Sequence, residues 1–323
     1  MGRRIAEQKV VSHWGIRGLV LSLALSACVD QGGPVRSPAP QPRPTPVAYE
    51  PSSESLALRR YYGAVERSLL TQGLLRTDGG GADVPFTGAM LARNFQRIAF
   101  YQEYSRAGNA LVARESRSNL NRWDRPVRLS LQFGASVDPD TRIKDRAFVA
   151  RYAARLARVT GHPISMTSPG VKTGNFRVFV LNNDELRNFG PELKRLVPGI
   201  SPAALNAVVN MRREEYCLVL ANDTGGTGRF QQAVAVVRAE HPDLMRKGCY
   251  HEEIAQGLGL SNDSPQARPS IFNDDEEFGL LTTHDEQLLK MLYDPRLTPG
   301  MSAEEAAPIV RRMAEELTGG GAA

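Results

Sequence analysis

The chain has 323 residues, of which 41% are hydrophobic and 23% are charged. It is long and apolar enough for one large or two modest domains with a buried core, which excludes a wholly disordered chain. It contains no run near the roughly 18 consecutive apolar residues of a spanning helix, which excludes a polytopic membrane protein. The net charge of +5 falls to +2 without the first 27 residues. We expect no nucleic-acid partner, because a nearly balanced surface does not steer a protein toward phosphates.

The amino terminus is predicted to be an export signal. Residues 1–17 are polar and basic, and residues 18–27 (GLVLSLALSA) form an apolar run. A basic segment before a short apolar run is typical of a secretory signal peptide, because the run is too short to span a membrane permanently. The run ends in LSAC, which resembles the bacterial lipobox, so we expect removal of residues 1–27 and lipidation of Cys28. The alternative is an ordinary secretory signal with an incidental cysteine.

The residues after the predicted lipid anchor indicate location and spacing. Val29 stands where lipoproteins of the inner membrane favour Asp, so the resemblance implies an anchor in the outer membrane, on its periplasmic face. Several acyl chains on one residue anchor a protein stably. Residues 28–50 contain six prolines, which favour extended polyproline II structure and predict a semi-rigid tether. A disordered spacer is the alternative, with the same consequence.

The cysteines are too few for a disulfide scaffold, since the chain has three. With Cys28 lipidated, Cys217 and Cys249 remain in an oxidising compartment, and we predict a disulfide between them. Two buried free thiols are the alternative. We expect no catalytic cysteine, because the sequence shows no evident set of His and Asn or Asp partners.

Residues 51–120 are predicted to form a helical amino-terminal region. Residues 55–75 read as one helix, which a run of three glycines ends. Residues 87–104 read as a second helix, because their apolar side chains recur at helical spacing. Neither helix shows candidate chemistry.

Residues 121–318 are predicted to form an α+β domain with a small mixed sheet. Apolar and polar residues alternate over 127–133, which predicts a strand. Asp138 and Pro139 predict the start of a helix that runs to about residue 159. Further strands are expected at 176–180, 217–220 and 233–237, and further helices at 184–196, 203–211, 244–258, 283–292 and 303–317.

Residues 249–263 (CYHEEIAQGLGLSND) are the segment that most suggests chemistry. His251 and Glu252 resemble the start of the HExxH motif of zinc proteases, in which two histidines on one helical face bind zinc and the glutamate is the general base. The second histidine would stand at Ala255. Gln256 follows it, turned about 140° from His251 on a regular helix. The literal motif is therefore absent.

A shift of one residue gives a resemblance to metzincin-type proteases, whose helix reads HExxHxxGxxH/D. Glu253 then aligns with the catalytic glutamate of the motif. Glu252 and Gln256 align with its first two histidines, and Asn262 aligns with its third metal ligand. Asp263 matches the terminal position of the motif. The alternative is an ordinary amphipathic helix that ends at a glycine.

This resemblance implies a zincin-like α+β domain whose zinc ligands are replaced. Zinc prefers imidazole and thiolate, whereas Glu, Gln and Asn offer oxygens and amides. Such a set would suit calcium or magnesium, if any ion. His251 could restore zinc binding only through a π-bulge that brings it together with Gln256. The cofactor is therefore unknown. We favour the absence of any cofactor over zinc or calcium.

The stretch that follows is rich in acidic residues. Residues 273–277 (NDDEE) could line a cation site, or they could form a solvated loop before a helix that Thr283 caps toward Glu286. We favour the loop. His284 stands near the start of that helix and is expected at the surface.

Several strings of this sequence resemble one bacterial group, the domain of unknown function family 2927. They are the lipobox, HEEIAQGLGLSND, RPSIFNDDEEF, LLTTHDEQLLKMLYDPRL and NRWDRPVRL. The resemblance covers most of the chain after the signal and implies a coherent fold and an envelope location. It brings no activity and no catalytic residues.

Two functions follow from these observations. The first is an envelope lipoprotein without zinc hydrolase activity, which uses a zincin-derived cleft to bind a peptide, a glycan or a partner protein, or serves as a structural spacer. The second is a metal-dependent peptidase or amidase with atypical ligands. Its general base would be Glu253, or Glu252 if His251 binds the metal, and its substrates would be envelope peptides or peptidoglycan.

Overall fold

The computed structural model describes residues 49–107, 110–223, 225–273 and 275–319. The predicted signal peptide, Cys28 and nearly all of the predicted tether lie outside the described residues. The chain divides into two units, Met1–Val47 and Ala48–Ala323, and the second unit contains all the described elements. None of the helices in these ranges combines the length and the apolarity needed to span a bilayer.

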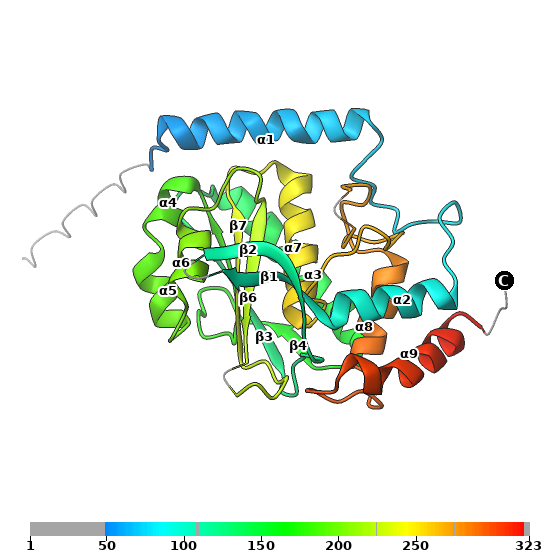
Figure 1. Cartoon of the computed structure of the whole chain (residues 1–323). Coiled ribbons are helices and arrows are strands. Elements are labelled where there is room, and N and C mark those ends of the chain that lie inside the picture. Colours follow the sequence, from blue (N-terminus) through cyan, green and yellow to red (C-terminus); the bar gives the residue numbers. More distant parts are fainter. Residues whose placement is uncertain (1–48, 108–109, 224, 274, 320–323) are drawn as a thin grey trace, which may run out of the picture. The chain divides into compact units, whose positions relative to one another are not determined.

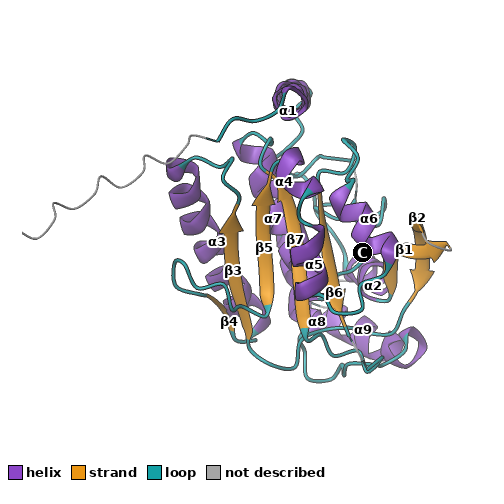
Figure 2. Ribbon diagram, turned by 90° about the vertical axis from the view of Figure 1, so that its left-hand side faces the viewer, coloured by secondary structure: helices purple, strands orange, loops and turns teal. Residues whose placement is uncertain are grey.

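A mixed five-stranded sheet forms the centre of this unit (Figure 2). The neighbouring strands β3, β4, β5 and β7 run parallel, and β6 runs antiparallel to β7 at one edge. The α+β class with a mixed sheet is therefore confirmed. The strands, in their order across the sheet, are β4 (Ile164–Met166), β3 (Val127–Phe133), β5 (Phe176–Leu181), β7 (Gln232–Arg238) and β6 (Cys217–Asn222).

Helices cover both faces of the sheet, so the inner strands are buried on both sides. Alternate side chains of β5 point to opposite faces: Val178 and Val180 enter the larger core, whereas Phe179 and Leu181 enter the smaller one. The larger core includes α2 (Gly88–Ala99), α3 (Pro139–Thr160), α7 (Asp243–Leu258), α8 (Thr283–Leu292) and α9 (Ala303–Leu317). The smaller core includes α4 (Asn183–Arg187), α5 (Gly190–Leu196) and α6 (Pro202–Val209).

The segment 51–120 is neither wholly helical nor separate from the sheet. Its helix α2 shares the larger core with strand β3. The predicted second helix ends at Ala99, and a hairpin of β1 (Tyr101–Ala107) and β2 (Ala110–Arg117) follows. The sequence has no Gly or Pro at that boundary, and its apolar residues keep helical spacing into the strand. The predicted helix was therefore too long.

The first helix, α1 (Ser53–Thr71), crosses the carboxyl ends of the parallel strands (Figure 1). Its start is bound to the residues after β5: Asp184 accepts hydrogen bonds from Tyr49 Oη at 3.0 Å and from Ser52 N at 2.9 Å. Farther along α1, Glu66 Oε2 accepts from Met245 N at 3.0 Å, in the first turn of α7. These contacts attach α1 to the sheet and to α7.

The distance between α7 and the sheet is set at Gly257. A Cβ there would overlap the ring of Phe176 and come within 3.1 Å of Val219 Cγ2. On the same residue, the carbonyl oxygen accepts a hydrogen bond of 2.8 Å from Trp123 Nε1, and the indole stacks on Phe176. Only a residue without a side chain allows this approach of helix and strands.

We expect the substitution Gly257→Ala to lower the free energy of unfolding by about 1–3 kcal/mol, because overpacking a filled core forces side chains and backbone apart. Urea denaturation followed by circular dichroism measures this loss. Gly63→Ala is the matched control, since its added Cβ would meet only Arg67 Nη1, at 3.4 Å. The control should lose no stability, and an equal loss in both variants would contradict the close-packing argument.

Candidate functional site

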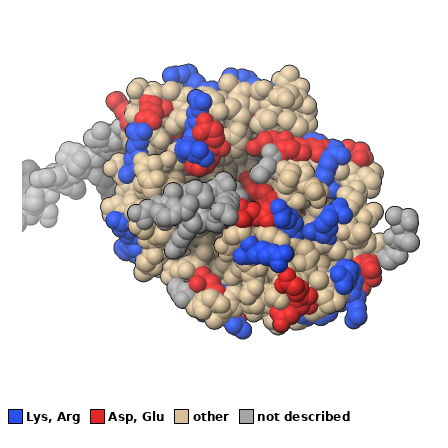
Figure 3. All heavy atoms as spheres, viewed as in Figure 1, with Lys and Arg blue, Asp and Glu red and all other residues tan. Residues whose placement is uncertain are grey.

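A groove of about 710 Å³ lies between the edge strand β6 and helix α7. The base of the β1–β2 hairpin closes one side of it through Gln102 and Ser116, and the hairpin crosses in front of β6 in Figure 1. Of the lining residues that the structure describes, six carry carboxylates and none is Lys or Arg. In Figure 3, acidic side chains lie beside the hollow at the centre of this face. The six are Glu214, Glu215, Glu252, Glu253, Asp263 and Glu276.

Four of the predicted site residues meet in this groove: Glu252, Glu253, Gln256 and Asp263. Glu253 and Gln256 are 3% and 8% exposed, so they lie at its floor. Gln256 Nε2 donates to Asp263 Oδ1 at 3.4 Å, which joins the end of α7 to the loop after it. The fold thus places these four residues side by side, together with Glu214, Glu215 and Glu276, which no sequence pattern singled out for this site.

His251 lies on another face of α7 and does not line the groove. Its ring, which is 4% exposed, stacks on Tyr152 at 3.8 Å and on Phe148 at 5.1 Å between ring centres. Its Nδ1 accepts a hydrogen bond of 2.9 Å from Leu281 N. Burial, with a smaller contribution from Arg155, lowers the pKa of His251 to about 3. The ring is thus a neutral part of the contact between α7, α3 and the start of α8.

The proposed third ligand, Asn262, also has its side chain in other contacts. It is 2% exposed, and its Nδ2 donates to the carbonyl oxygens of Arg97 at 3.2 Å and Asp263 at 2.7 Å. The bond to Arg97 attaches the loop after α7 to helix α2. The structure does not bring His251 and Asn262 together with Gln256. The helix α7 is α-helical throughout, without the π-bulge that zinc binding would require.

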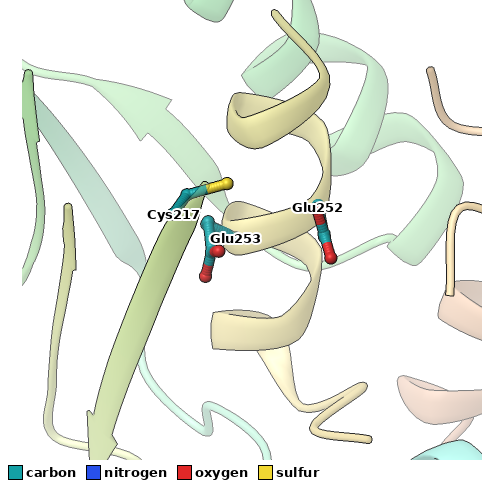
Figure 4. Close-up of side chains that lie close together, drawn as sticks. All are labelled: Cys217, Glu252 and Glu253. Atoms are coloured by element: carbon teal, nitrogen blue, oxygen red, sulfur yellow. The ribbon is translucent and has the colours of Figure 1, made fainter. Parts of the chain in front are cut away.

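The predicted disulfide between Cys217 and Cys249 is present and joins β6 to α7, with the two Cα atoms 5.9 Å apart. In Figure 4, Cys217 extends from β6 toward α7, from which Glu252 and Glu253 project. The ligand atoms of these three residues lie within 4.8 Å of one another. A sulfur in a disulfide is not a thiolate, so the donors left here are two carboxylates. Such a pair does not fit a zinc centre, which takes nitrogen and sulfur ligands.

Buried Arg238 orders the wall of the groove, and no sequence pattern indicated this role. It is fully buried at the end of β7, and it donates to the carbonyl oxygens of Met211 at 2.6 Å, Arg212 at 2.8 Å and Glu215 at 3.1 Å. These bonds hold the segment that leads into β6 and carries Glu214 and Glu215. At that rim, a hydrogen bond from Arg213 lowers the pKa of Glu214.

Two details of the acidic stretch differ from expectation. The cap of α8 is a capping box of Thr282 and Asp285, one residue before the predicted pair. His284 is fully buried, not exposed, and its Nε2 lies 3.1 Å from Asn94 Nδ2. In the loop itself, Glu277 pairs with Arg268 at 2.6 Å, while Glu276 reaches the groove. The burial of His284 could not be predicted from the residues near it in the sequence, because helix α2 covers it.

A family model described as "Protein of unknown function (DUF2927)" matches residues 88–312, which is well over half of the chain. The match includes α7 and the sheet. No curated protein and no solved structure matches the chain.

The buried neutral state of His251 predicts a loss of stability in acid. Below pH 6.5 the unfolded chain protonates this ring, whereas the folded chain does so only near pH 3. Stability therefore falls as the pH falls through this window, by up to about 1.4 kcal/mol per pH unit for this one group. Urea denaturation between pH 7 and pH 4 should show a shallower decline for His251→Gln than for the unaltered chain. Parallel declines would contradict the assignment.

Proposed function

The chain belongs to the DUF2927 family. From its lipobox-like LSAC sequence and from its groove we propose that it is a periplasmic lipoprotein of the outer membrane that binds an extended peptide segment. The binding site is the groove between β6 and α7. The domain is zincin-like in this proposal and has no zinc hydrolase activity. Its partner is an envelope protein or peptide, and the lipid on Cys28 holds it at the membrane.

The observation that carries this proposal is the edge strand beside an acidic floor. Within the described ranges β6 pairs with β7 alone, so its outer side has backbone groups that an added strand can pair with. Residues 217–221 of β6 line the groove, and Glu253 lies at its floor. Among the described lining residues six carry carboxylates and none is Lys or Arg, a composition that complements a segment carrying Lys or Arg.

The zincin-like relationship is supported by the order of the elements. The helix with the shifted motif, α7, follows the sheet directly, and it presents Glu253 to the groove beside an edge strand. That is the placement which the resemblance implies for a catalytic glutamate. The absence of zinc chemistry is supported by the neighbours of the glutamate: His251 packs against α3, and Cys217 is in a disulfide.

One observation favours the alternative, a metal-dependent peptidase or amidase. Oxygens of Glu252 and Glu253 lie within 4.8 Å of each other and could bind a hard divalent ion such as calcium or magnesium. Metal analysis of chain purified without chelator separates the two functions. One equivalent of metal per chain, together with a lower Tm after EDTA and cleavage of casein or peptidoglycan that Glu253→Gln abolishes, would support the enzyme.

Peptide binding tests the proposed function directly. We expect an extended peptide with several Lys or Arg residues to bind the full chain, and an Asp- and Glu-rich peptide of equal length not to bind. Glu253→Gln should weaken binding about tenfold, because it removes a charged hydrogen-bond acceptor at the groove floor. Fluorescence anisotropy measures the affinity. Glu315→Gln on the exposed side of α9 is the matched control and should leave it unchanged; equal affinities in all three chains would reject the site.

The anchor is tested separately from the groove. In bacteria fed a labelled fatty acid, we expect the full chain to take up the label and to sediment with outer membranes. Cys28→Ala should lose the label and leave the membrane fraction, because the acyl chains supply the binding energy. Cys217→Ala is the control, since that residue is in the disulfide. A labelled Cys28→Ala chain would exclude lipidation at this residue.

A further inference from the structure

A second cavity, of about 540 Å³, lies against the base of the hairpin on the side away from the groove. Neighbouring residues of a strand face opposite sides. Accordingly Tyr101 and Arg117 line this cavity, whereas the next pair, Gln102 and Ser116, lines the groove. We call this cavity the arginine pocket, after Arg93, Arg97 and Arg117 in its lining. Its other walls are the loop 264–266 and the first turns of α9.

The described lining of the arginine pocket has more positive than negative charge. It holds three guanidinium groups and one carboxylate, that of Glu304. Arg97 is paired with Glu115, which is not among the lining residues. Arg93 forms no ion pair with any residue that the structure describes. An anionic ligand would therefore meet a guanidinium without displacing a partner.

The guanidinium of Arg117 can also bind a ligand, with little loss of protein stability. Arg117 Nη1 lies 3.0 Å from Glu304 Oε1, and the two side chains are 73% and 70% exposed. An ion pair as exposed as this one contributes little to stability, because water screens both charges. A ligand carboxylate or phosphate can replace Glu304 at Arg117, since the planar guanidinium fork matches either group.

The pocket also offers a hydrogen-bond donor that the described part of the chain does not use. The side-chain nitrogen of Gln96, on α2 between Arg93 and Arg97, is buried and has no partner among the described residues. Leaving a buried donor unpaired is unfavourable, so a ligand oxygen that reaches it is favoured. Apolar surface is provided by Pro265, Ala303 and Ala307.

We propose that the arginine pocket is a binding site for a small organic anion, one that carries a carboxylate or a phosphate. Arg93 and Arg117 bind the charged group, Gln96 donates a hydrogen bond, and the apolar wall contacts the carbon skeleton. The volume lies within the range of about 300–1,000 Å³ that is usual for small-molecule sites. The site is independent of the groove and does not rest on peptide binding there.

Isothermal titration of the full chain in neutral detergent at low ionic strength tests the proposal. The probes are succinate for carboxylates, glycerol 3-phosphate for phosphates, and glycerol as the uncharged control. We expect saturable binding of one anion per chain by at least one of the two anionic probes, and none by glycerol. The stronger anion shows which group the pocket prefers.

Variants then locate the binding. Arg93→Gln and Arg117→Gln should each weaken it about tenfold, because each removes a charge-assisted hydrogen bond. Arg151→Gln, on the exposed side of α3, is the matched control and should change the affinity less than twofold. Equal affinities in all the variants, or no saturable binding of either anion, would overturn the proposal.

A measurement on the unaltered chain needs no variant to fold. Phenylglyoxal modifies accessible arginines, and mass spectrometry of the digested chain reports each site. Saturating anion should slow modification of Arg93 and Arg117 at least threefold and leave Arg151 unchanged. Equal slowing at the three positions would show binding outside the pocket.

Discussion

The arrangement of the groove depends on how α7 is fixed to the sheet. The disulfide of Cys249 holds the helix to β6, and Gly257 allows close contact with the strands near its end. Residues four and seven positions after Cys249 lie on the same stripe of a helix. Those residues are Glu253 and Gln256, which is why both reach the groove. With the helix held in this rotation, His251 must face α3, so its role as a packed neutral ring follows from the same constraint.

The groove and the arginine pocket share a thin partition with opposite charge on its two sides. The first two residue pairs of the hairpin and the loop after α7 form it, and alternate side chains serve alternate cavities. Among the described residues, six with carboxylates line one side and three arginines line the other. Local strand geometry therefore separates two charge environments within one small region.

Local sequence patterns predicted most of the sheet and the disulfide, because alternation, turn residues and cysteine context are visible within a few positions. The hairpin was missed, since its first residues continue the apolar spacing of α2. The groove residues Glu252, Glu253, Gln256 and Asp263 were found through one motif. The surroundings of His251 and His284 were not predictable, because their neighbours come from α3 and α2, more than 90 residues away. Arg238 was missed for a different reason: its acceptors are backbone carbonyls, which every residue type carries.

The attachment of Tyr49 and Ser52 to Asp184 has a mechanical consequence. Tension on the chain ahead of Tyr49 enters the folded unit at the end of β5, an inner strand of the sheet. The bonds to this one carboxylate carry the load first, and the turns of α1 unwind only after those bonds have broken. A domain pulled by its leading segment would yield at this junction while the strands beside the two cavities kept their registers.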